Sequence, residues 1–118
     1  MLAKKHRFQG PAGLTRVYQK GTTVRSQFSA ARYLRGRRNT YRVAVVVSKK
    51  VAKGAPERNR IRRRIFEIIR LLADSYLLNE DVVITVFDSR LSEISHAELQ
   101  DIVLRLLEQI KETQPIIK

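Results

Sequence analysis

The spacing of apolar residues predicts a long helix that begins at about residue 56 and ends at residue 73 or residue 78. Its large apolar side chains fall within about 100° of one another on an ideal helix, and they are Ile61, Ile65, Ile68, Ile69 and Leu72. The polar residues around this apolar stripe are Asn59, Arg63 and Arg70 opposite it, Arg60 and Arg64 along one border, and Arg62 along the other. We therefore expect the stripe to pack on a sheet and the arginines to remain outside.

Two further helices follow from the same kind of pattern. Residues 95–112 have helical spacing of apolar side chains, and they begin with Ser95 and Glu98, the pair that forms a capping box. A shorter helix is expected over residues 11–19, because a proline opens this segment and a glycine follows it.

Strands are predicted between these helices. Residues 22–34 are rich in β-branched and aromatic residues with rough alternation, which predicts one or two strands, and residues 36–40 have the glycine and asparagine of a turn. Residues 41–48 form a continuous apolar run, which predicts a strand in the centre of a sheet. Residues 81–88 predict another buried strand.

The order of these elements is αβββαβα, which indicates a single α/β sheet with helices packed on it. At 118 residues, the chain has the length of one domain, 1–118. We expect residues 1–10 to form a flexible basic tail and residues 113–118 to form a frayed one.

The charge of the chain points to a polyanionic partner. The net charge is +13, but residues 1–70 hold 20 lysines and arginines and 2 acidic residues, a charge of +18, whereas residues 71–118 carry −5. Such segregation favours nucleic acid, and less strongly an anionic membrane. Arginines outnumber lysines, which also favours nucleic acid because a guanidinium binds phosphate bidentately and stacks on bases.

Composition excludes several classes of protein. The chain has no cysteine, which rules out disulfides, thiolate metal sites and a cysteine nucleophile, and fits a reducing cytoplasm. It has neither a run of apolar residues long enough to span a membrane nor the apolar core of a signal peptide. We expect a cytoplasmic protein with no membrane partner.

Residues 49–64 form the densest basic segment. It contains Lys49, Lys50, Lys53, Arg58, Arg60, Arg62, Arg63 and Arg64, and its one acidic residue is Glu57. The alternative to a binding role is a solvated helix face, but such faces usually mix charges of both signs. Cations at a helix N-terminus also oppose the helix dipole, and the same end suits a bound phosphate.

Candidate catalytic residues are few. His6 and His96 have no partner at a useful spacing, and the acidic residues near the strand of 81–88 are Asp74, Glu80, Asp81 and Asp88. These carboxylates suit Mg²⁺ in principle, but we favour loop and capping roles for them. The chain has no phosphate-binding glycine motif and no cluster of metal ligands. We therefore expect neither a catalytic residue nor a metal site in the protein itself.

Aromatic residues in the basic half have two possible roles. Tyr18, Phe28, Tyr33 and Tyr41 either belong to the core or stack on unpaired bases. The position of Tyr18 beside polar residues favours the surface, whereas Phe28 suits the core and a cleft equally.

Residues 47–67 closely resemble the bacterial ribonuclease P protein subunit. That family has a strand ending in Ser-Lys-Lys, a short basic loop, and Arg-Asn-Arg-x-Lys/Arg-Arg at the start of a helix. Here these motifs read Ser48-Lys49-Lys50 and Arg58-Asn59-Arg60-Ile61-Arg62-Arg63. The resemblance extends over most of the chain, with departures at Leu14, Ala30 and Ala31, where the family often has bulkier or aromatic residues.

The resemblance implies an α/β (α+β) two-layer sandwich, with a small mixed sheet and a left-handed βαβ crossover. It implies a subunit of an RNA-protein endoribonuclease that binds the catalytic RNA and the 5′ leader of precursor tRNA. Mg²⁺, bound mainly by the RNA, would carry out the cleavage. The implied RNA-binding residues are Lys49, Lys50, Lys53, Arg58, Asn59, Arg60, Arg62 and Arg63, and the implied leader cleft includes Tyr18, Phe28 and Ser48. We expect the free protein to be a monomer.

Three other functions stay open from the sequence. A ribosomal-type structural RNA-binding protein shares the charge but has no role in tRNA maturation. A DNA-binding module would use the long helix in a major groove, although no helix-turn-helix pattern precedes that helix. A nuclease acting without RNA would depend on the carboxylates above.

Overall fold

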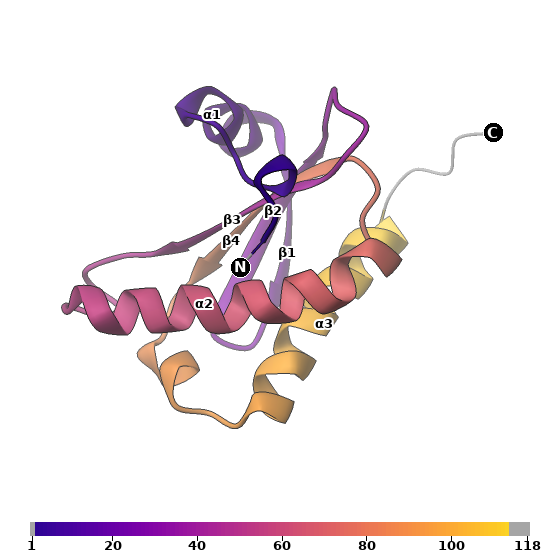
Figure 1. Cartoon of the computed structure of the whole chain (residues 1–118). Coiled ribbons are helices and arrows are strands. Elements are labelled where there is room, and N and C mark those ends of the chain that lie inside the picture. The colour runs from indigo at the N-terminus through magenta and orange to yellow at the C-terminus, as the bar shows by residue number, and fades with distance from the viewer. Residues whose placement is uncertain (1, 114–118) are drawn as a thin grey trace.

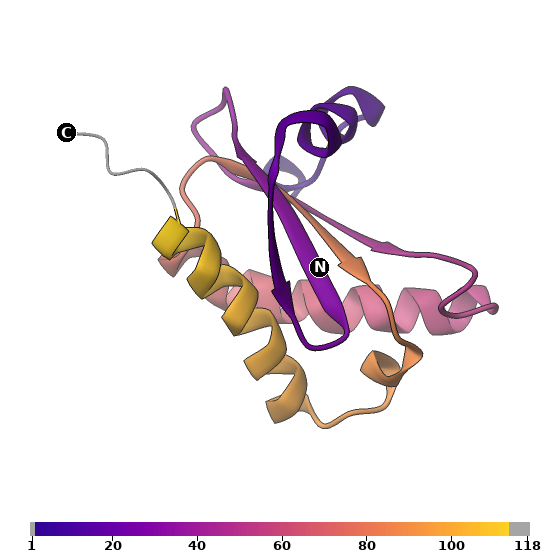
Figure 2. The same cartoon turned by 180° about the vertical axis from the view of Figure 1, so that it is seen from behind.

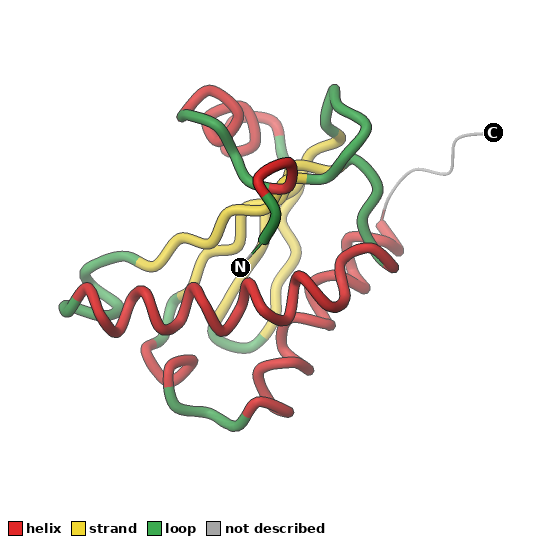
Figure 3. The backbone as a smooth tube through the Cα atoms, in the orientation of Figure 1, coloured by secondary structure: helices red, strands yellow, loops and turns green. Residues whose placement is uncertain are grey.

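The helices and strands follow one another in the predicted order. The computed structural model describes residues 2–113. Its elements are α1 (Pro11–Lys20), β1 (Thr22–Ser26), β2 (Ser29–Arg35), β3 (Arg42–Val47), α2 (Ala55–Leu72), β4 (Glu80–Val86) and α3 (His96–Thr113), with short 3-10 turns η1 (Lys4–His6), η2 (Ala73–Ser75) and η3 (Ser89–Ser92) (Figures 1 and 3). The αβββαβα prediction is confirmed. Most of the expected frayed tail, residues 114–118, lies outside the described residues.

The four strands form one mixed sheet in the order β1-β2-β4-β3. Residues 22–34 make two strands, the antiparallel hairpin of β1 and β2. β2 then pairs antiparallel with β4, and β4 pairs parallel with β3. The connection from β3 through α2 to β4 is therefore a crossover between parallel strands, and its left-handed sense stays a prediction.

The prediction that residues 41–48 form a central strand is wrong. β3 is an edge strand that pairs with β4 alone, and β4 holds the central position. An edge strand can carry this apolar run because the N-terminal segment covers part of the edge. His6 Nδ1 lies 2.9 Å from the backbone oxygen of Tyr41, and the rings of His6 and Tyr41 are stacked with centroids 3.8 Å apart. Protection of an exposed edge is a general need of sheets.

The N-terminal segment has a packed position, whereas its sequence suggested a mobile tail. Leu2 is only 3% exposed and joins the hydrophobic core, and the guanidinium of Arg42 lies over the ring of Phe8. The hydroxyl of Tyr41 donates to Asp74, and burial together with this bond raises the pKa of Tyr41 well above its usual value. Isolated apolar residues such as Leu2 and Phe8 show no periodicity, so the pattern gave no sign of this docking.

One face of the sheet carries the main core. Rows of paired residues such as Ala31, Ile84 and Val45 are buried there under α2 and α3 (Figures 1 and 2). The predicted stripe of α2 is confirmed, because its four isoleucines are at most 1% exposed and Leu72 packs against them. Ser95 accepts a hydrogen bond from the backbone N–H of Glu98 and so caps α3 as predicted.

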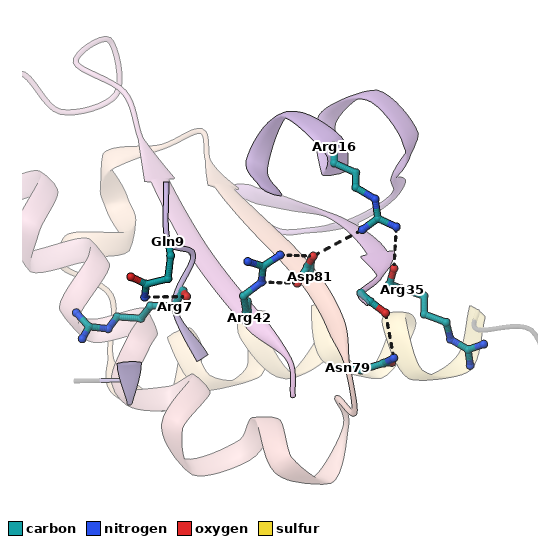
Figure 4. Close-up of polar contacts among 8 residues, drawn as sticks. Arg7, Gln9, Arg16, Arg35, Arg42, Asn79 and Asp81 are labelled. Atoms are coloured by element: carbon teal, nitrogen blue, oxygen red, sulfur yellow. Dashed lines mark hydrogen bonds and ion pairs between the residues drawn. The ribbon is translucent and has the colours of Figure 1, made fainter. Parts of the chain in front are cut away.

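The opposite face of the sheet is covered at one end by α1. There Asp81 of β4 is 1% exposed and accepts two hydrogen bonds of 2.8 Å from Arg42 of β3 (Figure 4). Arg16 of α1 lies 3.9 Å from the same carboxylate and donates to the backbone oxygen of Arg35. The hydrogen bond to Asp81 raises the pKa of Arg42, although burial opposes it. This buried charge thus connects α1, β3 and β4.

We expect Asp81→Asn to lower the free energy of unfolding by about 3 kcal/mol, because it leaves the cation of Arg42 half-buried without its counter-charge. The matched control is Asp101→Asn, which removes the exposed ion pair between Asp101 and Arg105 on α3 and is expected to cost less than about 0.5 kcal/mol. Urea unfolding followed by circular dichroism measures both. Equal effects of the two substitutions would contradict a structural role for Asp81.

Candidate nucleic-acid interface

The loop between β3 and α2 presents three lysines to solvent. The backbone N–H groups of Val51 and Ala52 both donate to the backbone oxygen of Ser48, which closes a tight turn after β3. Ala52 is 3% exposed and anchors the loop, whereas Lys49, Lys50 and Lys53 are exposed. The loop therefore holds its cations outward on a fixed backbone.

The first turn of α2 adds backbone donors to these cations. Gly54 is the N-cap residue, and no side chain among the described residues caps the helix. The first N–H groups of a helix have no partner within it, and the helix dipole is positive at this end. Such an end attracts an anion, and surrounding lysines strengthen the attraction.

Arg58 links α2 to the loop of residues 48–54, which we call the lysine loop. Its Nη1 atom donates to the backbone oxygens of Ala52 and Lys53 at 2.9 and 2.8 Å. The resemblance of the motif implies only an RNA-binding role for Arg58. The structure shows that one of its nitrogens supports the shape of the loop.

Arg60 and Arg64 face the turn η3, on the border of the apolar stripe where they were predicted. Arg60 Nε donates to the backbone oxygen of Ser92 at 2.9 Å, and Arg64 donates to those of Leu91 and Ile94 at 2.8 and 2.5 Å. These bonds satisfy carbonyl groups at the end of η3 and in the segment that follows it. Arg60, an expected RNA-binding residue, therefore also tethers α2 to the connection between β4 and α3.

Asn59 and Arg63 face solvent, and Arg62 is half-buried on the other border of the stripe. Arg63 and the three loop lysines form no ion pair with any described residue. We call Lys49, Lys50, Lys53 and Arg63 the free cations of this surface, since they are exposed and no carboxylate in the described part of the chain pairs with them.

The residues expected in a leader cleft lie in two places. Phe28 and Ser48 directly flank the paired residues Ser29, Val86 and Val47, so they share one end of the sheet with the lysine loop. Tyr18 is 46% exposed on α1, which covers the other end. The structure thus places Phe28 and Ser48 at one end of the sheet and Tyr18 at the other, and Phe28 packs partly against the core.

Two further residues at this end of the sheet were not predicted from the sequence. Phe87 follows β4 and is 54% exposed, and its backbone N–H donates to the oxygen of Phe28 at 2.8 Å. The guanidinium of Arg90 lies 4.9 Å from the ring centre of Phe28, which has a positive φ of 61°. A bulky residue rarely adopts this conformation, so these contacts hold Phe28 in place. The sequence signal for Phe87 was an aromatic residue at the end of an apolar strand, but this position is equally typical of a core residue.

The free cations are distant from the exposed acidic residues of α3. The free cations lie at the N-terminal end of α2, whereas α3 carries exposed Glu98, Asp101 and Glu112. In both views these two regions lie at opposite sides of the molecule (Figures 1 and 2). A search of the described residues also finds no helix with the length and apolarity needed to cross a membrane.

Comparison with known proteins identifies the family. The family model described as Ribonuclease P matches residues 2–111. The chain belongs to the ribonuclease P protein family. This confirms the resemblance found at residues 47–67, and it supports a role as a protein component of ribonuclease P.

Relatives and solved structures agree with this assignment. The ribonuclease P protein component of Chloroflexus aurantiacus is 34% identical over 108 residues, covering 92% of this chain and 79% of the relative. That of a Pseudanabaena species is 32% identical, covering 94% and 96%. The RNase P proteins of Staphylococcus aureus and Thermotoga maritima superpose with TM-scores of 0.77 and 0.79 at 23% and 18% identity, covering 90% and 88% of this chain and 95% and 96% of theirs. These structures confirm the α+β fold.

The carboxylates considered for Mg²⁺ in this ribonuclease P family member have separate partners. Asp74 binds the hydroxyl of Tyr41, Asp81 binds Arg42, and Asp88 accepts from the backbone N–H of Arg90. Glu80 is buried and accepts from the backbone N–H of Leu78. Within residues 2–113, no three acidic or histidine side chains gather as metal ligands. Asp88 caps the turn η3, as we favoured, whereas Glu80 and Asp81 lie in strand β4 and not in a loop or a cap.

The neighbouring arginines of α2 are expected to differ in their effect on stability. Arg64→Ala removes two hydrogen bonds from a cation to carbonyl oxygens and should lower the free energy of unfolding by about 2 kcal/mol. Arg63→Ala changes an exposed side chain and should shift it by no more than about 0.5 kcal/mol. Urea titrations of both variants test this difference. Equal stability of the two would mean that the bonds of Arg64 to the η3 connection contribute nothing.

Proposed function

We propose that this chain binds the catalytic RNA of ribonuclease P and assists removal of the 5′ leader from precursor tRNA. The observation that carries the proposal is the surface of free cations around the uncapped start of α2. Lys49, Lys50, Lys53 and Arg63 are exposed there and form no ion pair with a carboxylate of residues 2–113. RNA phosphates would neutralise these charges and accept hydrogen bonds from the free N–H groups of the helix.

The leader is proposed to lie on the sheet face that α1 covers only in part. At one end of the sheet, near Ser48 and the lysine loop, Phe87 is exposed and its backbone N–H donates to Phe28, whose ring is partly buried against the core. At the other end, Tyr18 is exposed on α1. Base–aromatic stacking is tolerant of sequence because every base has a flat apolar face. This arrangement suits a single strand of varied sequence.

The protein's contribution is electrostatic and geometric. Mg²⁺ held mainly by the RNA would supply the chemistry of phosphodiester hydrolysis. The free cations lower the repulsion between the catalytic RNA and precursor tRNA, and so they lower the Mg²⁺ concentration needed to assemble the two. We propose that the protein acts in this way as a monomer in the cytoplasm.

The direct test is cleavage of a precursor tRNA by a bacterial ribonuclease P RNA at limiting Mg²⁺, with and without this protein. We expect cleavage at the mature 5′ end to be efficient only when both are present. A reaction with protein alone is the control for a nuclease that acts without RNA. Tight RNA binding without stimulation of cleavage would instead favour a structural RNA-binding protein.

The role of the free cations is tested by the salt dependence of RNA binding. Each phosphate contact contributes about 0.7–0.9 to the slope of log affinity against log salt. The triple substitution Lys49→Ala, Lys50→Ala and Lys53→Ala should therefore reduce the slope by about two. Arg105→Ala, which changes an exposed cation among the acids of α3, should leave it unchanged. An unchanged slope in the triple variant would show that the lysine loop does not contact RNA phosphates.

A further inference from the structure

A cavity between the N-terminal segment and α2 has a lining that is both apolar and cationic. Its volume is about 520 Å³, within the range of small-molecule sites. Leu2 and Arg7 form one wall, and Asn59, Arg62, Arg63 and Phe66 of α2 form the other. The apolar part consists of Leu2, which is 3% exposed, and the half-buried ring of Phe66.

The charged part of the lining has an excess of cations. Three arginines line the cavity, and the one carboxylate there, Glu67, is hydrogen-bonded to Arg70 outside it. Arg7 and Arg63 are exposed, so their guanidinium groups remain accessible. The cavity therefore suits a ligand that carries negative charge.

One donor in this lining lacks a partner. Arg62 is half-buried, and its Nη1 atom is buried without a hydrogen-bond acceptor anywhere in residues 2–113. A buried donor without an acceptor is costly, and the great majority in native proteins are satisfied. Arg62 itself lines the cavity, so a small shift of its guanidinium would bring this donor to a ligand that carries an oxygen or a ring nitrogen.

The N-terminal wall is held in place by its own contacts. The His6 ring stacks on Tyr41 with an interplanar angle of 8°, and Arg42 lies over Phe8. These contacts fix the segment between Leu2 and Arg7 along the edge strand. The cavity is thus a feature of the folded domain.

We propose that this cavity holds one unpaired nucleotide of RNA, with its base against Phe66 and Leu2 and its phosphate against Arg7 and Arg63. A bare phosphate would leave the apolar wall unused, and a neutral apolar ligand would leave the arginines unused. A base within a duplex is stacked on both faces, so only an extruded base can enter. Asn59 and Arg62 supply polar groups for the edge of the base. This inference rests on the proposed RNA-binding function and adds a defined site to it.

The experiment compares Phe66→Leu with wild type in two binding assays. The first measures affinity for a bacterial ribonuclease P RNA, and the second measures affinity of the assembled holoenzyme for precursor tRNA, each at several salt concentrations. Phe66→Leu keeps an apolar side chain but removes the flat ring, so we expect a loss of about tenfold with the salt slope unchanged. A loss in the first assay assigns the nucleotide to the catalytic RNA, and a loss in the second alone assigns it to precursor tRNA.

Three variants control the interpretation. Phe66→Tyr keeps the ring and should retain most of the affinity. Leu71→Ala removes a 63% exposed side chain of α2 outside the cavity and should bind as wild type. Arg63→Ala should instead reduce the salt slope by about one, because it removes a phosphate contact. Urea unfolding of each variant confirms that the domain remains folded.

The outcomes separate this site from RNA binding in general. Wild-type affinity of folded Phe66→Leu in both assays, with weaker binding by Arg63→Ala, would overturn the nucleotide site and keep the proposed function. A reduced salt slope in Phe66→Leu would also overturn it, because the ring would then act only through phosphate contacts. Failure of the wild-type protein to bind either RNA would overturn the proposed function itself.

Discussion

Burial of the apolar stripe of α2 against the sheet is the interaction on which the rest of this structure depends. Each buried isoleucine contributes roughly 2 kcal/mol, whereas a like-charge pair on a helix costs only about 0.2–0.5 kcal/mol. Four isoleucines at most 1% exposed therefore offset the repulsion among the arginines beside them. The domain can keep a concentrated positive charge at the start of a helix because this helix is stabilised by tertiary packing.

The same packing gives each side of α2 a different neighbour. Along one border, Arg60 and Arg64 reach the carbonyl groups around η3 and tie the helix to the chain that leads to α3. Along the other, Arg62 lines the cavity closed by the N-terminal segment. Arg63, opposite the stripe, faces solvent. One basic motif thus combines structural tethers, a cavity wall and a free cation, and a charge count alone does not distinguish them.

The sheet brings the rest of the candidate interface to the same end of the molecule. Because β4 is central and lies between β2 and β3, the residues that follow or precede these strands become neighbours. Phe28, Phe87 and Ser48 come from three separate segments, yet all lie beside the row that contains Val86. The lysine loop begins at Ser48, so aromatic and cationic groups lie at the same end of the sheet, where the loop leads into α2.

The amino-acid sequence alone determined the elements, their order, the buried stripe of α2 and the cationic character of residues 49–64. These features depend on local periodicity and composition, which a single chain displays directly. Strand order was not accessible in this way: β3 was expected at the centre, and only tertiary structure shows it at an edge covered by the N-terminal segment. The docking of Leu2, the tethers of Arg60 and Arg64, and the pairing of Asp81 with Arg42 were equally hidden. They join residues far apart in the chain, and such contacts form only when packing brings the segments together.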